Sequence, residues 1–124
     1  MIAKTDPGEK VRIRMREPFE RRTVTVLSTD MVGYSRMMAL DPDATVQAIR
    51  FCEQALRQSA DRYRGRLFSR AGDGFLVEFE REFDAVQAGL EIQHELRMHN
   101  SEHPLELQIW LRAGIHCGEA IIDD

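Results

Sequence analysis

Two short apolar runs that each end at an aspartate constrain this chain more than any other feature. The first run covers residues 24–27 and leads to Asp30, which is followed by a loop-like segment with Gly33 near its middle. The second run precedes Asp73, which stands between Gly72 and Gly74, and another apolar run follows at once. Such runs are typical of buried β-strands. Carboxylates at the ends of neighbouring strands suit a site for hard divalent cations and phosphates.

The first half of the sequence alternates between strand and helix patterns. Residues 23–27 predict a central strand, and residues 35–40 have room for at least one helical turn. Asp41, Pro42 and Asp43 then form a helix start, because an N-cap aspartate, a first-turn proline and a second acidic residue all favour that position. The helix is expected to reach about residue 63, where Arg64 and Gly65 end it. Its apolar stripe is predicted to be Val46, Ile49, Leu56, Ala60 and Tyr63.

The second half predicts a hairpin, a helix and a further pair of strands. Residues 66–71 and 75–80 flank an Asp-Gly turn, which is a strong hairpin signal. A helix over residues 82–98 is expected to bury Phe83, Val86, Leu90, Ile92 and Leu96. Residues 105–115 alternate strictly between apolar and polar, as a strand with one buried face does. The chain is then predicted to turn at residues 117–119 into a short strand over 120–122.

This order gives a βαββαβ sheet with both helices on one face, because crossover connections are right-handed. A length of 124 residues allows one domain. We expect that domain to cover residues 23–124, preceded by a leader over residues 1–22. The alternation of Val11, Ile13 and Met15 with arginines makes the leader either a linker or an added edge strand.

Composition excludes several classes of function. A formal net charge of −4 argues against sequence-independent nucleic-acid binding. No apolar run approaches the roughly 20 residues that span a bilayer, and the N-terminus lacks the apolar core of a secretory signal. We therefore expect a cytoplasmic protein with no membrane segment and no nucleic-acid partner. His99 and His103 are interpreted as surface histidines, because the residues after them interrupt a helix.

Each aspartate alone has an ordinary structural explanation. Asp73 suits a simple hairpin turn, and Asp30 could cap the turn that follows it. As a pair they suit two-metal phosphoryl chemistry, in which carboxylates hold cations that neutralise the attacking and leaving oxygens. Gly33 also permits close approach of the backbone to a phosphate.

Three motifs together resemble the class III nucleotidyl (adenylate/guanylate) cyclase catalytic domain. They are TVLSTDMVGYSR at residues 25–36, AGDGFLVEF at residues 71–79 and RAGIHCGEA at residues 112–120. Residues 83–86 and 91–93 also resemble the second helix of that family, so the resemblance covers about residues 23–122. It implies an α+β, ferredoxin-like βαββαβ core and a homodimer with active sites at the subunit interface.

The resemblance also assigns roles to residues. Asp30 and Asp73 would be the catalytic, metal-binding carboxylates for two Mg²⁺ or Mn²⁺ ions, with the carbonyl of Met31 as a further metal ligand. The backbone that would bind the triphosphate belongs to Val32, Gly33, Tyr34 and Ser35. A nucleoside triphosphate, with ATP favoured over GTP, would become a 3′,5′-cyclic nucleotide and pyrophosphate for cyclic-nucleotide signalling.

Two departures from the family pattern qualify this assignment. Ser69 stands where adenylate cyclases usually have an adenine-reading lysine, so the base preference is open, and Arg70 should point to the opposite face. The family domain also continues beyond residue 124, and its transition-state asparagine and arginine have no counterpart here. We therefore predict little or no turnover by this chain alone. The alternatives are a non-catalytic cyclase-like module for dimerisation or nucleotide sensing, and another two-metal phosphoryl-transfer fold of similar topology.

Overall fold

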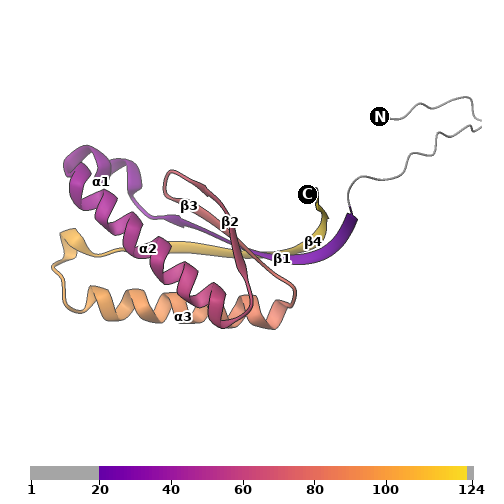
Figure 1. Cartoon of the computed structure of the whole chain (residues 1–124). Coiled ribbons are helices and arrows are strands. Elements are labelled where there is room, and N and C mark those ends of the chain that lie inside the picture. The colour runs from indigo at the N-terminus through magenta and orange to yellow at the C-terminus, as the bar shows by residue number, and fades with distance from the viewer. Residues whose placement is uncertain (1–19, 123–124) are drawn as a thin grey trace, which may run out of the picture.

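The computed structural model describes residues 20–122, which form a four-stranded antiparallel sheet covered by helices (Figure 1). In chain order the elements are β1 (Glu20–Met31), α1 (Tyr34–Leu40), α2 (Pro42–Arg62), β2 (Arg66–Ala71), β3 (Gly74–Phe79), α3 (Glu82–Asn100), the 3₁₀ turn η1 (Leu105–Leu107) and β4 (Leu111–Ile122). The strand order is β2-β3-β1-β4, which confirms the predicted ferredoxin-like α+β fold. The strand pattern predicted in the leader lies outside the described residues.

β1 is the central strand, and it is longer than the predicted strand over residues 23–27. It pairs with β3 on one side and along its whole length with β4 on the other, from Glu20 opposite Ile122 to Met31 opposite Leu111. Leu27 and Met31 are buried against the helices. The extension places Asp30 inside the strand and not in the loop after it.

α2 begins as the sequence predicts. The Asp41 side chain accepts a hydrogen bond from the amide of Ala44, at 3.1 Å, which satisfies one of the unpaired donors of the first turn. The helix ends before Arg64, which has a positive φ of 61°.

The buried face of α2 includes Ile49 and Cys52 but not Val46, which is 37% exposed. Burial raises the pKa of the Cys52 thiol to about 12, so this cysteine stays protonated in the core.

α3 was predicted correctly in position, and Ile92 and Leu96 are buried as expected, but the other three residues of its predicted buried face are not. Phe83, Val86 and Leu90 are exposed, whereas the buried face consists of Asp84, Ala85, Ala88, Ile92, Leu96 and Asn100. Small residues on this face let the helix lie close to the sheet, and a Cβ atom added at Gly89 would already contact Leu27 at 3.7 Å.

No helix within residues 20–122 is long and apolar enough to cross a bilayer.

The last predicted strand is displaced along the sequence. Residues 105–107 form a 3₁₀ turn, and β4 begins only at Leu111, because that is where β1 supplies its last partner, Met31. The turn predicted at residues 117–119 is absent, since pairing with β1 continues through this stretch to Ile122. The final predicted pair of strands is therefore a single strand of 12 residues.

Candidate functional site

The structure brings the two candidate aspartates to the same end of the sheet. Asp30 is the penultimate residue of β1, and Asp73 lies in the turn between β2 and β3. The amide of Met31 donates a hydrogen bond to Oδ2 of Asp73, at 2.8 Å. β1 and β3 are neighbours in the sheet, so the Asp73 carboxylate is held against the residue that follows Asp30.

Arg112 is a site residue that the sequence reasoning missed. It is the partner of Asp30 in the pairing of β1 with β4, and its Nε donates a hydrogen bond to Oδ1 of Asp30, at 2.8 Å. Both side chains are well exposed, so the pair is a modest contributor to stability. A correct alignment of the two strands would have revealed the contact, but the predicted turn at residues 117–119 concealed it.

The segment after Asp30 turns sharply into α1. Gly33 has a φ of +74° and precedes the first residue of the helix, and its carbonyl accepts a hydrogen bond from the amide of Met37. The amide of Val32 donates to the carbonyl of Trp110, at 2.8 Å, which ties this segment to the chain before β4. The Tyr34 side chain packs against the core, whereas Ser35 is exposed.

Ser69 lies in β2, beside an irregularity in the pairing of β2 with β3. Its partner in that pairing is Leu76 of β3, and its side chain is half-buried. Arg70 instead forms an ion pair with Glu53 of α2, at 3.0 Å. The arginine is thus occupied on the helix-covered face of the sheet.

The donors present fit magnesium or manganese rather than a metal held by protein side chains alone. No three histidine, cysteine or acidic side chains within residues 20–122 converge on one point. Among the described residues, only one oxygen of each candidate carboxylate is engaged, Oδ1 of Asp30 and Oδ2 of Asp73. Mg²⁺ is commonly bound by one or two carboxylates together with water and substrate phosphates. The remaining oxygens of Asp30 and Asp73 could serve in that way.

His99 and His103 are not ordinary surface histidines. Both are half-buried, and their rings stack with centroids 4.1 Å apart. They line a pocket together with residues of α2 and η1, and none of the candidate cyclase residues lines that pocket.

Comparison with known proteins gives a consistent result. No protein-family model matches the sequence. The chain is 33% identical over 110 residues to "Putative adenylate cyclase 3" of Rhizobium meliloti (strain 1021), an alignment that covers 88% of this chain and 19% of that protein. The chain therefore spans about a fifth of the length of this relative.

Solved structures share the fold. An adenylate/guanylate cyclase/hydrolase from Silicibacter pomeroyi has a TM-score of 0.77 and 27% identity, over 86% of this chain and 62% of that one. The guanylyl cyclase Cya2 has a TM-score of 0.72 and 26% identity, over 83% of this chain and 57% of that one. The sequence likeness, the fold and the cyclase-like motifs agree, and together they support a class III nucleotidyl cyclase catalytic domain, of which the chain spans a part.

Proposed function

We propose that this chain is the metal- and triphosphate-binding part of a nucleotidyl cyclase that converts a nucleoside triphosphate to a 3′,5′-cyclic nucleotide and pyrophosphate. The observation that carries the proposal is the 2.8 Å hydrogen bond from the amide of Met31, the residue after Asp30, to the carboxylate of Asp73 at one end of the sheet. The names of the similar proteins support the same reaction class.

Asp30 and Asp73 are the residues that would hold two Mg²⁺ or Mn²⁺ ions, with the Met31 carbonyl as an additional oxygen ligand. Bound ions of this kind stabilise negative charge on phosphate oxygens and lower the pKa of a coordinated hydroxyl. The chain itself contributes by positioning these groups, because two strands and one turn hold the carboxylates in place before the substrate binds. This reduces the entropy lost on reaching the reactive geometry.

The phosphates are proposed to lie along the backbone of residues 32–35. The positive φ of Gly33 lets the chain reverse direction at this point. Arg112 lies close enough to act here as well, because its guanidinium already contacts Asp30. If Asp30 held a cation, the Arg112 guanidinium would be released to contact a phosphate oxygen, and arginine suits such contacts.

ATP is the proposed nucleotide, although Ser69 can both donate and accept a hydrogen bond and so suits either base. The proposed active form is a homodimer in the cytoplasm, with each subunit contributing to a site at the interface. The chain's only asparagine, Asn100, is buried and bonded to both backbone polar groups of Ile109. It is therefore unavailable as a transition-state group, and we expect the 124-residue chain to bind nucleotide with little turnover.

One experiment separates this proposal from its alternatives. The purified chain is titrated with ATP and GTP in the presence of Mn²⁺, and cyclic nucleotide and pyrophosphate are measured in the same samples. Manganese-dependent binding that Asp30→Asn and Asp73→Asn abolish is the expected result. If neither substitution changed nucleotide binding, the proposed site would be contradicted. Formation of pyrophosphate without a cyclic product would favour a different phosphoryl-transfer reaction. Rapid formation of cyclic nucleotide would refute only the expectation of low turnover and not the proposed site.

The second candidate is a non-catalytic module for dimerisation or nucleotide sensing. It is favoured by the ion pair between Arg112 and Asp30, because a guanidinium beside this carboxylate offsets the negative charge that would attract a cation. Under this alternative, Mn²⁺ would leave nucleotide affinity unchanged.

A further inference from the structure

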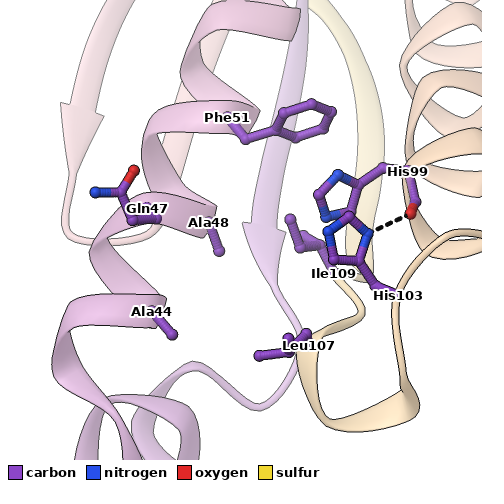
Figure 2. A pocket seen from close by; sticks show the side chains of 8 residues that line it. All are labelled: Ala44, Gln47, Ala48, Phe51, His99, His103, Leu107 and Ile109. Carbon is purple, nitrogen blue, oxygen red and sulfur yellow. Dashed lines mark hydrogen bonds between the residues drawn. The ribbon is translucent and has the colours of Figure 1, made fainter.

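A pocket separate from the candidate cyclase site lies between the first half of α2 and the segment that runs from the end of α3 to β4. Its volume is about 270 Å³. Figure 2 shows Ala44, Ala48 and Phe51 of α2 on one side and His99 and His103 on the other. Ile109, which is buried, also lines the pocket. The walls are thus mainly apolar, and among the described residues the imidazoles are their only titratable groups.

The two imidazoles are held in one arrangement by their neighbours. His99 lies between Phe51 and His103, with ring centroids 4.5 Å and 4.1 Å away, respectively. Nδ1 of His103 lies 2.7 Å from the backbone carbonyl of His99. Because a carbonyl can only accept, Nδ1 must carry the proton, and Nε2 of the neutral ring is then an acceptor. Within residues 20–122 no side chain or backbone group bonds to the ring nitrogens of His99.

No acidic side chain among the described residues lines the pocket beside the two imidazoles, so an anion bound there would not be repelled by a pocket wall. The facing α2 residues, Ala44, Ala48 and Phe51, carry no charge. The nearby acids are Glu102, which follows α3, and Glu95, one turn before His99, and neither lines this pocket. Burial lowers the pKa of His99 and the positive charge of His103 lowers it further, while Glu102 acts in the opposite direction. An anion placed beside both rings would compensate this cost of protonation.

We propose that this pocket binds a small aromatic carboxylate, whose ring lies against Ala44, Ala48 and Ile109 and whose carboxylate contacts His99 and His103. The volume is slightly below the ~300–1,000 Å³ of most ligand pockets, so the ligand is a single ring rather than a nucleotide. An apolar cavity of about 150 Å³ already accepts benzene, which leaves space for the carboxylate. The proposal is independent of cyclase activity, because none of these residues belongs to the candidate cyclase site.

Binding and proton uptake are coupled in this site. A carboxylate is best bound when at least one imidazole is protonated, so the ligand raises the proton affinity of the pair, and lower pH raises the affinity for the ligand. For one proton taken up, the dissociation constant changes by up to about tenfold per pH unit above the imidazole pKa. A neutral ligand of the same shape gains nothing from protonation.

The test uses the full chain, benzoate as the anionic probe and benzyl alcohol as the neutral one. The imidazole resonances of all four histidines are followed by NMR during titrations at pH 6 and pH 8. We expect benzoate to shift His99 and His103 but not His94, and to bind at least about tenfold more tightly at pH 6. Equal affinities of the two probes at both pH values would overturn the proposal, as would uniform shifts of every histidine.

Matched variants test the two rings directly. His99→Gln and His103→Gln should each weaken benzoate binding at pH 6 by about tenfold and reduce its pH dependence, with little effect on benzyl alcohol. His94→Gln serves as the control, because His94 is an exposed residue on the same helix. Circular dichroism confirms that each variant is folded, and His103→Gln provides the second test should His99→Gln unfold. If both folded variants bound benzoate as tightly as the parent protein does, the imidazoles would not form the site.

Discussion

The amide of Met31 and the Oδ2 atom of Asp73 are 2.8 Å apart, although 42 positions separate the two residues in sequence. This single hydrogen bond fixes the turn between β2 and β3 against the end of β1. It also uses only one oxygen of the Asp73 carboxylate, which leaves the other for a cation.

Replacement of Asp73 should separate its structural role from its proposed metal-binding role. Asp73→Asn keeps an oxygen acceptor for Met31, so the free energy of unfolding should change by less than about 1 kcal/mol. Loss of the charge should weaken Mn²⁺-dependent nucleotide binding at least about tenfold, since even residues that only support metal ligands cost 10–100-fold. Calorimetric titration measures the affinity, and urea unfolding measures the stability.

Two further variants complete this comparison. Asp73→Ala removes the acceptor as well and should cost about 1–2 kcal/mol more in stability. Asp61→Asn is the control, because Asp61 is exposed near the end of α2 and is not one of the candidate site residues. An Asp73→Asn protein that binds manganese and nucleotide as tightly as the parent would show that Asp73 only closes the turn.

Arg112 should compete with cations for Asp30. Arg112→Gln removes the guanidinium that lies 2.8 Å from Oδ1 of Asp30, so Mn²⁺ affinity without nucleotide should rise by up to about fivefold. That factor corresponds to the 1 kcal/mol or less of an exposed ion pair. Arg57→Gln, which breaks the exposed pair with Glu53 on α2, controls for the change in net charge. Unchanged or weaker manganese binding in Arg112→Gln would count against competition.

Gly33 should be required for its backbone conformation rather than for space. Its φ is +74°, yet an added Cβ would meet no atom within 4 Å. Gly33→Ala is therefore expected to lower the free energy of unfolding by about 1–2 kcal/mol through the left-handed conformation alone. Gly114→Ala has equally open surroundings without a positive φ, so it should not destabilise the protein. Equal stabilities of the two variants would rule out this explanation.

The fold was largely predictable because local signals and pairing preferences agree. Asp41 and Pro42 mark the start of α2, and the Asp-Gly pair marks the turn after β2, without any knowledge of the tertiary structure. The order of these elements then restricts the sheet to few arrangements. The two candidate aspartates follow from the same signals, since each stands where an apolar run ends.

The errors come from contacts that a single sequence does not show. The large apolar residues Phe83 and Leu90 looked like the buried face of α3, but the sheet accepts the small residues Ala85 and Ala88 instead. The start of β4 depends on where β1 ends, which is a property of strand pairing and not of the alternating pattern. Arg112 was overlooked for the same reason, because its contact with Asp30 joins residues 82 positions apart.

His99 should make stability depend on pH when no carboxylate ligand is present. Burial and His103 lower its pKa in the folded protein, so between that pKa and the ordinary value of about 6.5 the unfolded chain binds more protons. Stability should therefore decrease as the pH falls through this window. Urea unfolding from pH 7.5 to pH 5 should show a smaller decrease in His99→Gln than in the parent or in His94→Gln. A stability that rises as the pH falls would contradict the sign.

The exposed face of α3 should promote self-association. Phe83 and Leu90 are each 62% exposed and Val86 is 42% exposed, and they lie at the spacing of one helical stripe. The adjacent strand β4 has no partner on its outer edge among the described residues. Unpaired edges and contiguous apolar patches favour contacts between chains. Light scattering at rising protein concentration should therefore show species larger than a monomer.

Charged substitutions on this face test the cause of the association. Leu90→Lys and Phe83→Glu should each lower the average mass at a fixed high concentration, because a charge in a contact between chains must be desolvated. Neither side chain is part of the core, so the stability of the monomer should change by less than about 0.5 kcal/mol. Leu40→Lys is the matched control, since Leu40 is 74% exposed at the end of α1. If Leu40→Lys disperses the protein as well as Leu90→Lys does, general solubility and not the α3 face controls the association.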